Sequence, residues 1–116
     1  MPSDKRIRWF EDILDNIARI ERCGLDRQAF VADERVIFAV LHALLIVSEA
    51  ARRLGNEAET LTPDQPWRHI RGLGNVLRHE YSDVDTDAIW RIVVDDLPVL
   101  KAAVKRAMAD LRSCST

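Results

Sequence analysis

The fold is decided by the apolar stretch Val36-Ile-Phe-Ala-Val-Leu-His-Ala-Leu-Leu-Ile-Val47. As a helix this stretch is apolar on nearly every side, because successive residues turn by about 100°. Such a helix needs cover all round. In a chain of 116 residues it predicts either the central helix of a bundle or a face buried against a second copy. Asp33 can cap this helix and Gly55 can end it, so we expect it over residues 33–54.

Two polar residues in this helix have ordinary structural explanations. We expect His42 to be a histidine of the core or of an interface, with one hydrogen-bond partner. We expect Glu49, near the end of the helix, to be a buried or half-buried structural acceptor rather than a catalytic acid. Neither residue therefore predicts chemistry by itself.

The segments on either side repeat apolar residues at helical spacing. Residues 4–23 do so behind a possible cap at Asp4, and residues 85–97 behind one at Asp85. Pro98 fits best in the first turn of a last helix, and residues 26–32 form a connection with some helical tendency. No segment alternates as a strand does. The chain therefore predicts a single all-α domain over residues 1–116, a bundle of four or five helices.

Composition limits the function classes. Hydrophobic residues make up 47% and charged residues 31%, which is typical of a folded protein. The net charge of −2 gives no general attraction to nucleic acid, so such contact requires a local patch. The N-terminus lacks an apolar signal core, no apolar run is long enough for a bilayer, and Cys23 and Cys114 are isolated. We therefore expect a cytoplasmic protein with no membrane partner.

Residues 66–81 gather the side chains suited to chemistry. As a helix beginning near Trp67, this stretch has one apolar stripe and, on the other side, an arc of polar residues about 100° wide. The stripe is Ile70, Leu73 and Leu77, and the arc is Arg71, Asn75, Arg78 and His79, with Tyr81 nearby. The arc could bind and cut a phosphodiester or could be a solvated helix face. Two interior glycines, Gly72 and Gly74, indicate close approach of another backbone or a ligand.

The residue pattern favours chemistry without a metal or a cofactor. The three histidines, at 42, 69 and 79, have no partner at i+4, and no cysteine cluster, phosphate-binding glycine loop or serine elbow is present. Metal-free RNA cleavage needs a base for the 2′-hydroxyl proton, a cation for the phosphorane charge and an acid for the leaving oxygen. Histidine suits the proton transfers and arginine suits the phosphate.

Several segments together form a pattern that can be compared with known families. They are Glu49-Ala50-Ala51, Pro66-Trp67-Arg68, Gly72-x-x-Asn75-x-Leu77-x-His79-x-Tyr81, Val84-Asp85 and Asp95-Asp96-Leu97-Pro98. This pattern resembles the HepT-like branch of the HEPN superfamily, from the second expected helix to the last. The resemblance implies an all-α, cytoplasmic homodimer that acts as an RNase toxin beside a minimal nucleotidyltransferase antitoxin.

The signature of that family is Arg-x4-His-x-Tyr, usually with Asn after the Arg. The resemblance makes His79 the catalytic histidine, Asn75 the polar residue after the Arg, and Tyr81 the tyrosine to which the antitoxin transfers AMP. Two positions depart from the pattern: Gly74 stands in place of the arginine, and Ser48 in place of the glycine of a Gly-Glu-Ala segment. Arg71 or Arg78 would then have to hold the phosphate.

Two hypotheses follow. The first is a metal-independent endoribonuclease toxin of a type II toxin–antitoxin system, with His79 as acid or base and Arg78 or Arg71 as phosphate clamp, neutralised by AMP transfer to Tyr81. The second is a non-catalytic HEPN-like helical module that binds a nucleotidyltransferase partner or a nucleotide. Replacement of His79 separates them, because it abolishes RNA cleavage only under the first.

Overall fold

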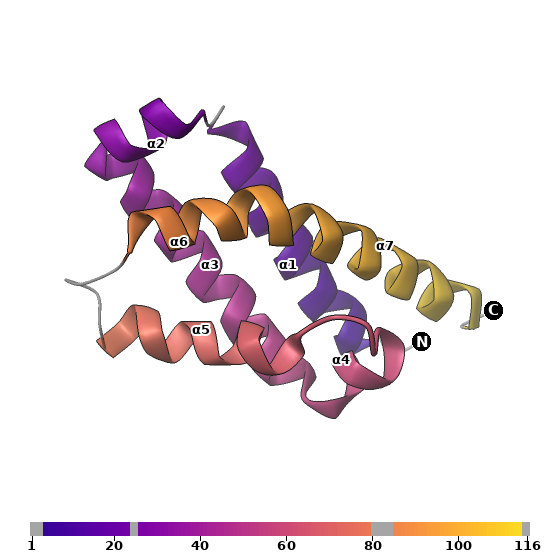
Figure 1. The fold of residues 1–116 in the computed structure, drawn as a ribbon. Helices are drawn as coiled ribbons and strands as arrows, with labels where there is room; N and C mark the ends of the chain where they lie inside the picture. The colour runs from indigo at the N-terminus through magenta and orange to yellow at the C-terminus, as the bar shows by residue number, and fades with distance from the viewer. Residues whose placement is uncertain (1–3, 24–25, 80–84, 115–116) are drawn as a thin grey trace.

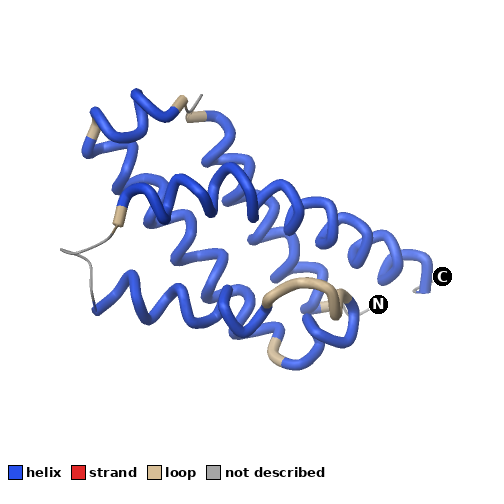
Figure 2. The backbone as a smooth tube through the Cα atoms, in the orientation of Figure 1, coloured by secondary structure: helices blue, strands red, loops and turns tan. Residues whose placement is uncertain are grey.

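A computed structural model describes residues 4–23, 26–79 and 85–114, with the backbone alone for residues 78, 79 and 114. Within these ranges the chain is helical apart from short connections and contains no strand (Figure 2). The long helices are α1 (Lys5–Arg22), α3 (Glu34–Leu54), α5 (Trp67–His79) and α7 (Leu97–Cys114) (Figure 1). This arrangement confirms the expected all-α bundle. None of the helices in the described ranges is both long enough and apolar enough to span a bilayer.

Side-chain caps fix the starts of the helices where the sequence predicts them. The carboxylates of Asp4, Asp33 and Asp85 accept hydrogen bonds from backbone N–H groups in the first turns of α1, α3 and α6 (Thr86–Arg91). Asp26 caps the short helix α2 (Arg27–Ala32) in the same way. Gly55 ends α3 with φ of 57°, a value that favours glycine.

The short helix α4 (Asn56–Leu61) was not predicted, because residues 56–65 have the composition of a polar connection. One apolar residue, Ala58, is fully buried and holds α4 against the core. Its polar residues make contacts that are distant in sequence, since Glu57 pairs with Arg6 and Glu59 pairs with Arg71. These contacts exist only in the folded chain, so the local sequence could not indicate them.

The prediction of a break before Pro98 is wrong. Figure 1 shows α6 and α7 as one continuous rod, joined by the π-helical turn Ile92–Asp96. The N–H of Leu97 bonds to the carbonyl of Ile92, five residues earlier. Because proline has no N–H to donate, one wide turn lets the chain pass Pro98 without ending the helix. Pro98 does lie in the first turn of α7, as expected.

The core lies around α3, which packs against α1 and α5 most extensively. Its largest fully buried side chains include Phe10, Ile13, Ile17, Phe30, Val40, Leu44, Val47, Trp67 and Val104. The other helices do not cover α3 on every side, however, because Phe38 is 44% exposed and His42 is also exposed. Of the two expectations for His42, a histidine of the core is therefore wrong, and a histidine of an interface stays a prediction.

A polar joint connects α5 to the end of α3. The Arg71 guanidinium donates from Nε to the carbonyl of Ala51 and from Nη2 to that of Gly55, at 3.3 and 2.7 Å. It also pairs with the Glu59 carboxylate. Both carbonyls also accept backbone N–H groups, Ala51 from Gly55 and Gly55 from Ala58. Arg71 therefore adds side-chain hydrogen bonds at the C-terminal end of α3 and holds α5 beside it.

Glu59→Gln should weaken this joint at neutral pH but not in acid. The Arg71 guanidinium holds the pKa of the Glu59 carboxyl below its ordinary value of 4.5. The contribution of the pair is therefore fully present above the unfolded-state pKa and is lost as the pH falls through the lower folded-state pKa. Urea unfolding midpoints of wild type and variant should differ at pH 7 and converge in acid.

Asp15→Asn is a suitable control, because Asp15 is an exposed carboxylate in the middle of α1. It should show no comparable pH-dependent difference. A Glu59→Gln difference of the same size at pH 7 and in acid would contradict the assigned role of the pair.

Candidate functional site

The N-terminal end of α5 is anchored in the core by Trp67. Its side chain is 1% exposed, and its indole N–H donates to the carbonyl and the hydroxyl of Thr62 at 3.0 and 2.8 Å. The centroid of its ring lies 6.4 Å from that of Phe10 in α1. Pro66 precedes the helix, and its carbonyl accepts from the N–H of Ile70. The helix thus begins directly after Pro66, as the sequence predicts.

The apolar stripe of α5 lies against the core as expected. Leu77 is buried, and Ile70 and Leu73 are half-buried and packed on the core cluster. On the other side, Asn75 is exposed. The predicted division of the helix into an apolar and a polar side is therefore confirmed for these residues.

Gly74 marks a close approach of α5 to α3. Gly74 is buried, and its N–H donates to the hydroxyl of Ser48 at 3.0 Å. The same hydroxyl donates to the carbonyl of Arg71 at 3.0 Å. The expectation for interior glycines is met at Gly74 and fails at Gly72, where an added Cβ would meet no atom within 4 Å. Nothing in the structure explains Gly72.

The two departures from the family pattern, at positions 48 and 74, are thus in contact. At 100° per residue, position 74 lies between Trp67 and Ile70 on the side of α5 that faces α3. A long side chain at 74 would start in this interface. Sequence reasoning assigned no role to Ser48, although a serine in a helix with little other polarity was the available signal.

Arg71 does not lie where a phosphate clamp would be expected. Its guanidinium is bound by two carbonyls and one carboxylate at the end of α3. Binding a phosphate would cost these contacts, including the ion pair with Glu59. Of the two arginines considered, this geometry favours Arg78 as the phosphate clamp, and the role of Arg71 stays a prediction.

Three predicted site residues lie outside what the structure describes. α5 extends to His79, but the side chains of Arg78 and His79 are not described, and Tyr81 lies in the undescribed range 80–84. Their roles as acid or base, phosphate clamp and AMP acceptor stay predictions. Helical geometry puts Arg78 about 40° from Gly74 and His79 about 100° further.

A groove between α5 and the rod formed by α6 and α7 is a second candidate. It has a volume of about 240 Å³ and an apolar floor that includes Leu44 and Val47 of α3. Its lining also contains the carboxylates of Asp64, Asp95 and Asp96. Because like charges repel, three aspartates beside a single histidine, His69, in the lining do not suit a phosphodiester. The polar end of α5 is therefore the better candidate for a nucleic-acid site.

Gly74→Arg should lower stability by about 1–3 kcal/mol, because it adds a long side chain at a buried position where α5 contacts α3. Gly72→Arg is a matched control on the same helix, and it should be neutral or stabilising by up to about 1 kcal/mol, since it replaces an exposed helical glycine. Urea unfolding of both variants measures the difference. Equal gains in stability for the two would contradict the position assigned to Gly74.

Comparison with known proteins supports one family. The family model "Ribonuclease HepT-like" matches residues 13–107. A provisionally named RNase of Methanocaldococcus jannaschii is 35% identical over 81 residues, covering 70% of this chain and 74% of that protein. A provisionally named ribonuclease HepT of Thermococcus cleftensis is 33% identical over 100 residues, covering 84% and 91%. No solved structure matches the chain significantly.

A third relative, a provisionally named RNase of Caldanaerobacter subterraneus, is 32% identical over 90 residues, covering 77% of this chain and 80% of that protein. The matched region includes α3, α5 and the buried stripe between them, which are the elements that carry the candidate site. The chain therefore belongs to the HepT-like ribonuclease family, of the HEPN type.

Proposed function

We propose that this chain is a metal-independent endoribonuclease that acts as the toxin of a type II toxin–antitoxin system. Membership of a ribonuclease family supports the reaction class. The observation that carries the proposal for this chain is the setting of α5. Its Gly74 side lies against α3 and its Asn75 side faces solvent, next to the turn that contains Arg78 and His79.

The proposed reaction is transfer of the phosphodiester to the 2′-oxygen of the same nucleotide. A base removes the 2′-hydroxyl proton as this oxygen attacks phosphorus, and an acid protonates the departing 5′-oxygen. His79 is proposed for proton transfer, and Arg78 for binding the charge on the phosphorane oxygens. Asn75 would add a neutral hydrogen bond to the substrate. The motif has one imidazole per chain, that of His79, so the second proton transfer must be supplied from elsewhere.

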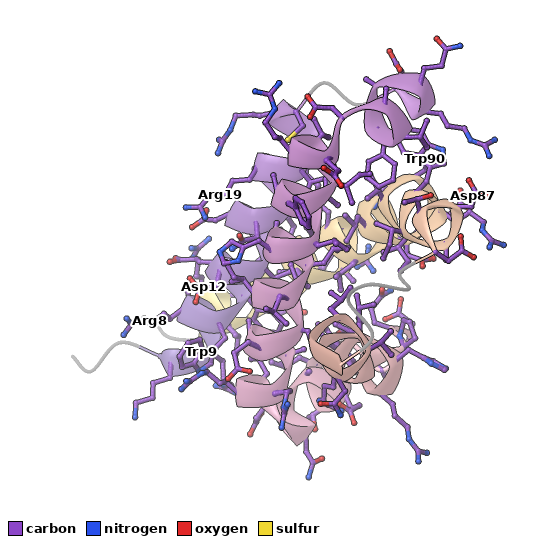
Figure 3. The ribbon with its side chains drawn as sticks, turned by 90° about the vertical axis from the view of Figure 1, so that its left-hand side faces the viewer. Arg8, Trp9, Asp12, Arg19, Asp87 and Trp90 are labelled. Carbon is purple, nitrogen blue, oxygen red and sulfur yellow. The ribbon has the colours of Figure 1, made fainter. Side chains whose placement is uncertain are left out.

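A homodimer would supply that second imidazole. The outer side of α3 presents Phe38, His42, Leu45 and Ile46, which are exposed or half-buried. Figure 3 views the molecule from the side on which α5 ends, and there α3 lies between α1 and α6. We propose that a second copy binds this outer side of α3 and brings two α5 ends onto the same face. The site would then be assembled by two subunits.

Neutralisation is proposed to act on the same end of α5. A minimal nucleotidyltransferase antitoxin would transfer AMP from ATP to the phenol oxygen of Tyr81, with release of pyrophosphate. The added phosphate would place negative charge beside the proposed phosphate site, where it would repel RNA. An intact-mass measurement after incubation with the nucleotidyltransferase and ATP would detect the addition.

His79→Ala should abolish cleavage of a labelled RNA in the presence of a chelator. Loss of a positioned acid or base costs about 10²–10⁴-fold in rate. His69→Ala is the matched control, since His69 is an exposed histidine on the same helix, and it should retain activity. Cleavage that requires a divalent cation, or that survives His79→Ala, would refute the mechanism.

One observation favours a second candidate function. Gly74 replaces the arginine of the family signature, and the guanidinium of Arg71 is bound to groups at the end of α3. Two of the cations that could hold a phosphate on this helix are therefore not available. The alternative is a non-catalytic HEPN-like module that binds a nucleotidyltransferase or a nucleotide. If this alternative holds, the wild type cleaves RNA no faster than the His79→Ala variant. His79→Ala then changes only partner binding.

Ile46→Glu should convert a dimer into a monomer, because it puts a charge on the outer side of α3. Val99→Glu is the control, since Val99 is 56% exposed on α7, away from that surface. Light scattering coupled to size exclusion measures the mass of each. A monomeric wild type, or an unchanged mass for Ile46→Glu, would contradict the proposal that two subunits assemble the site.

A further inference from the structure

The hydroxyl of Ser48 has an unusual position for a serine within a helix. Serine in a helix commonly bonds a carbonyl of its own preceding turn, whereas Ser48 bonds the neighbouring helix. Ser48 is 0% exposed and lies in the middle of α3. Both its donor and an acceptor lone pair are used, so the buried hydroxyl is fully paired with α5.

The two partners of this hydroxyl define how α5 is placed. They are the Arg71 carbonyl and the Gly74 N–H, three residues apart on one turn of α5. An oxygen that must be within 3.0 Å of both can tolerate neither a slide of α5 along its axis nor a rotation about it. Apolar contacts such as those of Leu77 are less directional. The setting of α5 on α3 is thus determined by this hydroxyl more than by the stripe around it.

A second attachment lies further along α3. The Arg71 guanidinium reaches the carbonyls of Ala51 and Gly55, which are three and seven residues beyond Ser48, or about 5–10 Å along the helix. Two polar attachments at separate points prevent α5 from tilting as well as from turning. Within the described part of the chain, the Ser48 hydroxyl is the polar attachment that reaches the half of α5 containing Asn75 and His79.

We propose that Ser48 is a positioning residue for the motif side chains at the end of α5, an inference that rests on the proposed ribonuclease function. A helix with its side chains has a radius of about 5–6 Å, so a rotation of about 10° displaces a side-chain tip by about 1 Å. A misplacement of 1 Å at a reacting group can cost about a hundredfold in rate. The Ser48 hydroxyl keeps the motif side chains within this tolerance without touching the RNA.

Ser48→Ala tests the proposal, because alanine keeps the packing of the Cβ and removes both hydrogen bonds. The imidazole resonances of His79 and the side-chain amide resonances of Asn75 should shift. On a labelled RNA, kcat should fall about ten- to a hundredfold, while KM stays within about twofold. Val104→Ala is the control for lost stability alone, since Val104 is 0% exposed in α7, and it should change neither the resonances nor kcat.

The two readouts separate failure of this inference from failure of the ribonuclease function. If the wild type does not cleave RNA, the resonances of Asn75 and His79 still decide whether Ser48 sets the end of α5. Unchanged resonances in Ser48→Ala would overturn the proposal. An equal loss of kcat in Ser48→Ala and Val104→Ala would also overturn it, because the hydroxyl would then contribute only to stability.

Discussion

The structure depends on the hydrogen bonds that one buried hydroxyl makes across the crossing of α3 and α5. A buried polar group is costly unless it is paired, and Ser48 is paired in both directions with the backbone of α5. This requirement brings Gly74 against α3 and directs Asn75 outward. The candidate site is thus located by a polar contact within a largely apolar interface.

The small net charge of the molecule does not reveal that acidic and basic residues gather in different places. Aspartates line the groove between α5 and the rod of α6 and α7, including Asp95 in the π-helical turn. The polar end of α5 contains Arg78 and His79 instead. A net charge of −2 is therefore compatible with a site for phosphate, provided that the site lies at the end of α5 and not in the groove.

Arg71 illustrates why residue type and helical spacing identify candidates but not roles. By spacing it belongs with Asn75 and Arg78 on the polar side of α5, and a guanidinium is suited to phosphate. In the folded chain it instead donates to the carbonyls of Ala51 and Gly55 and pairs with Glu59. These partners come from the end of α3, from Gly55 and from α4. The short helix α4 is the element that the sequence did not reveal.

The sequence by itself determined the all-α class, the starts of the helices at Asp4, Asp33 and Asp85, the apolar stripe of α5 and the family resemblance, because each depends on local periodicity, capping or motif spacing. Tertiary structure alone decided the exposure of His42, the continuous rod through Pro98, the contacts of Arg71 with the end of α3 and the contact between Ser48 and Gly74. Each of these depends on which groups meet across helices, and a one-dimensional pattern does not contain that information.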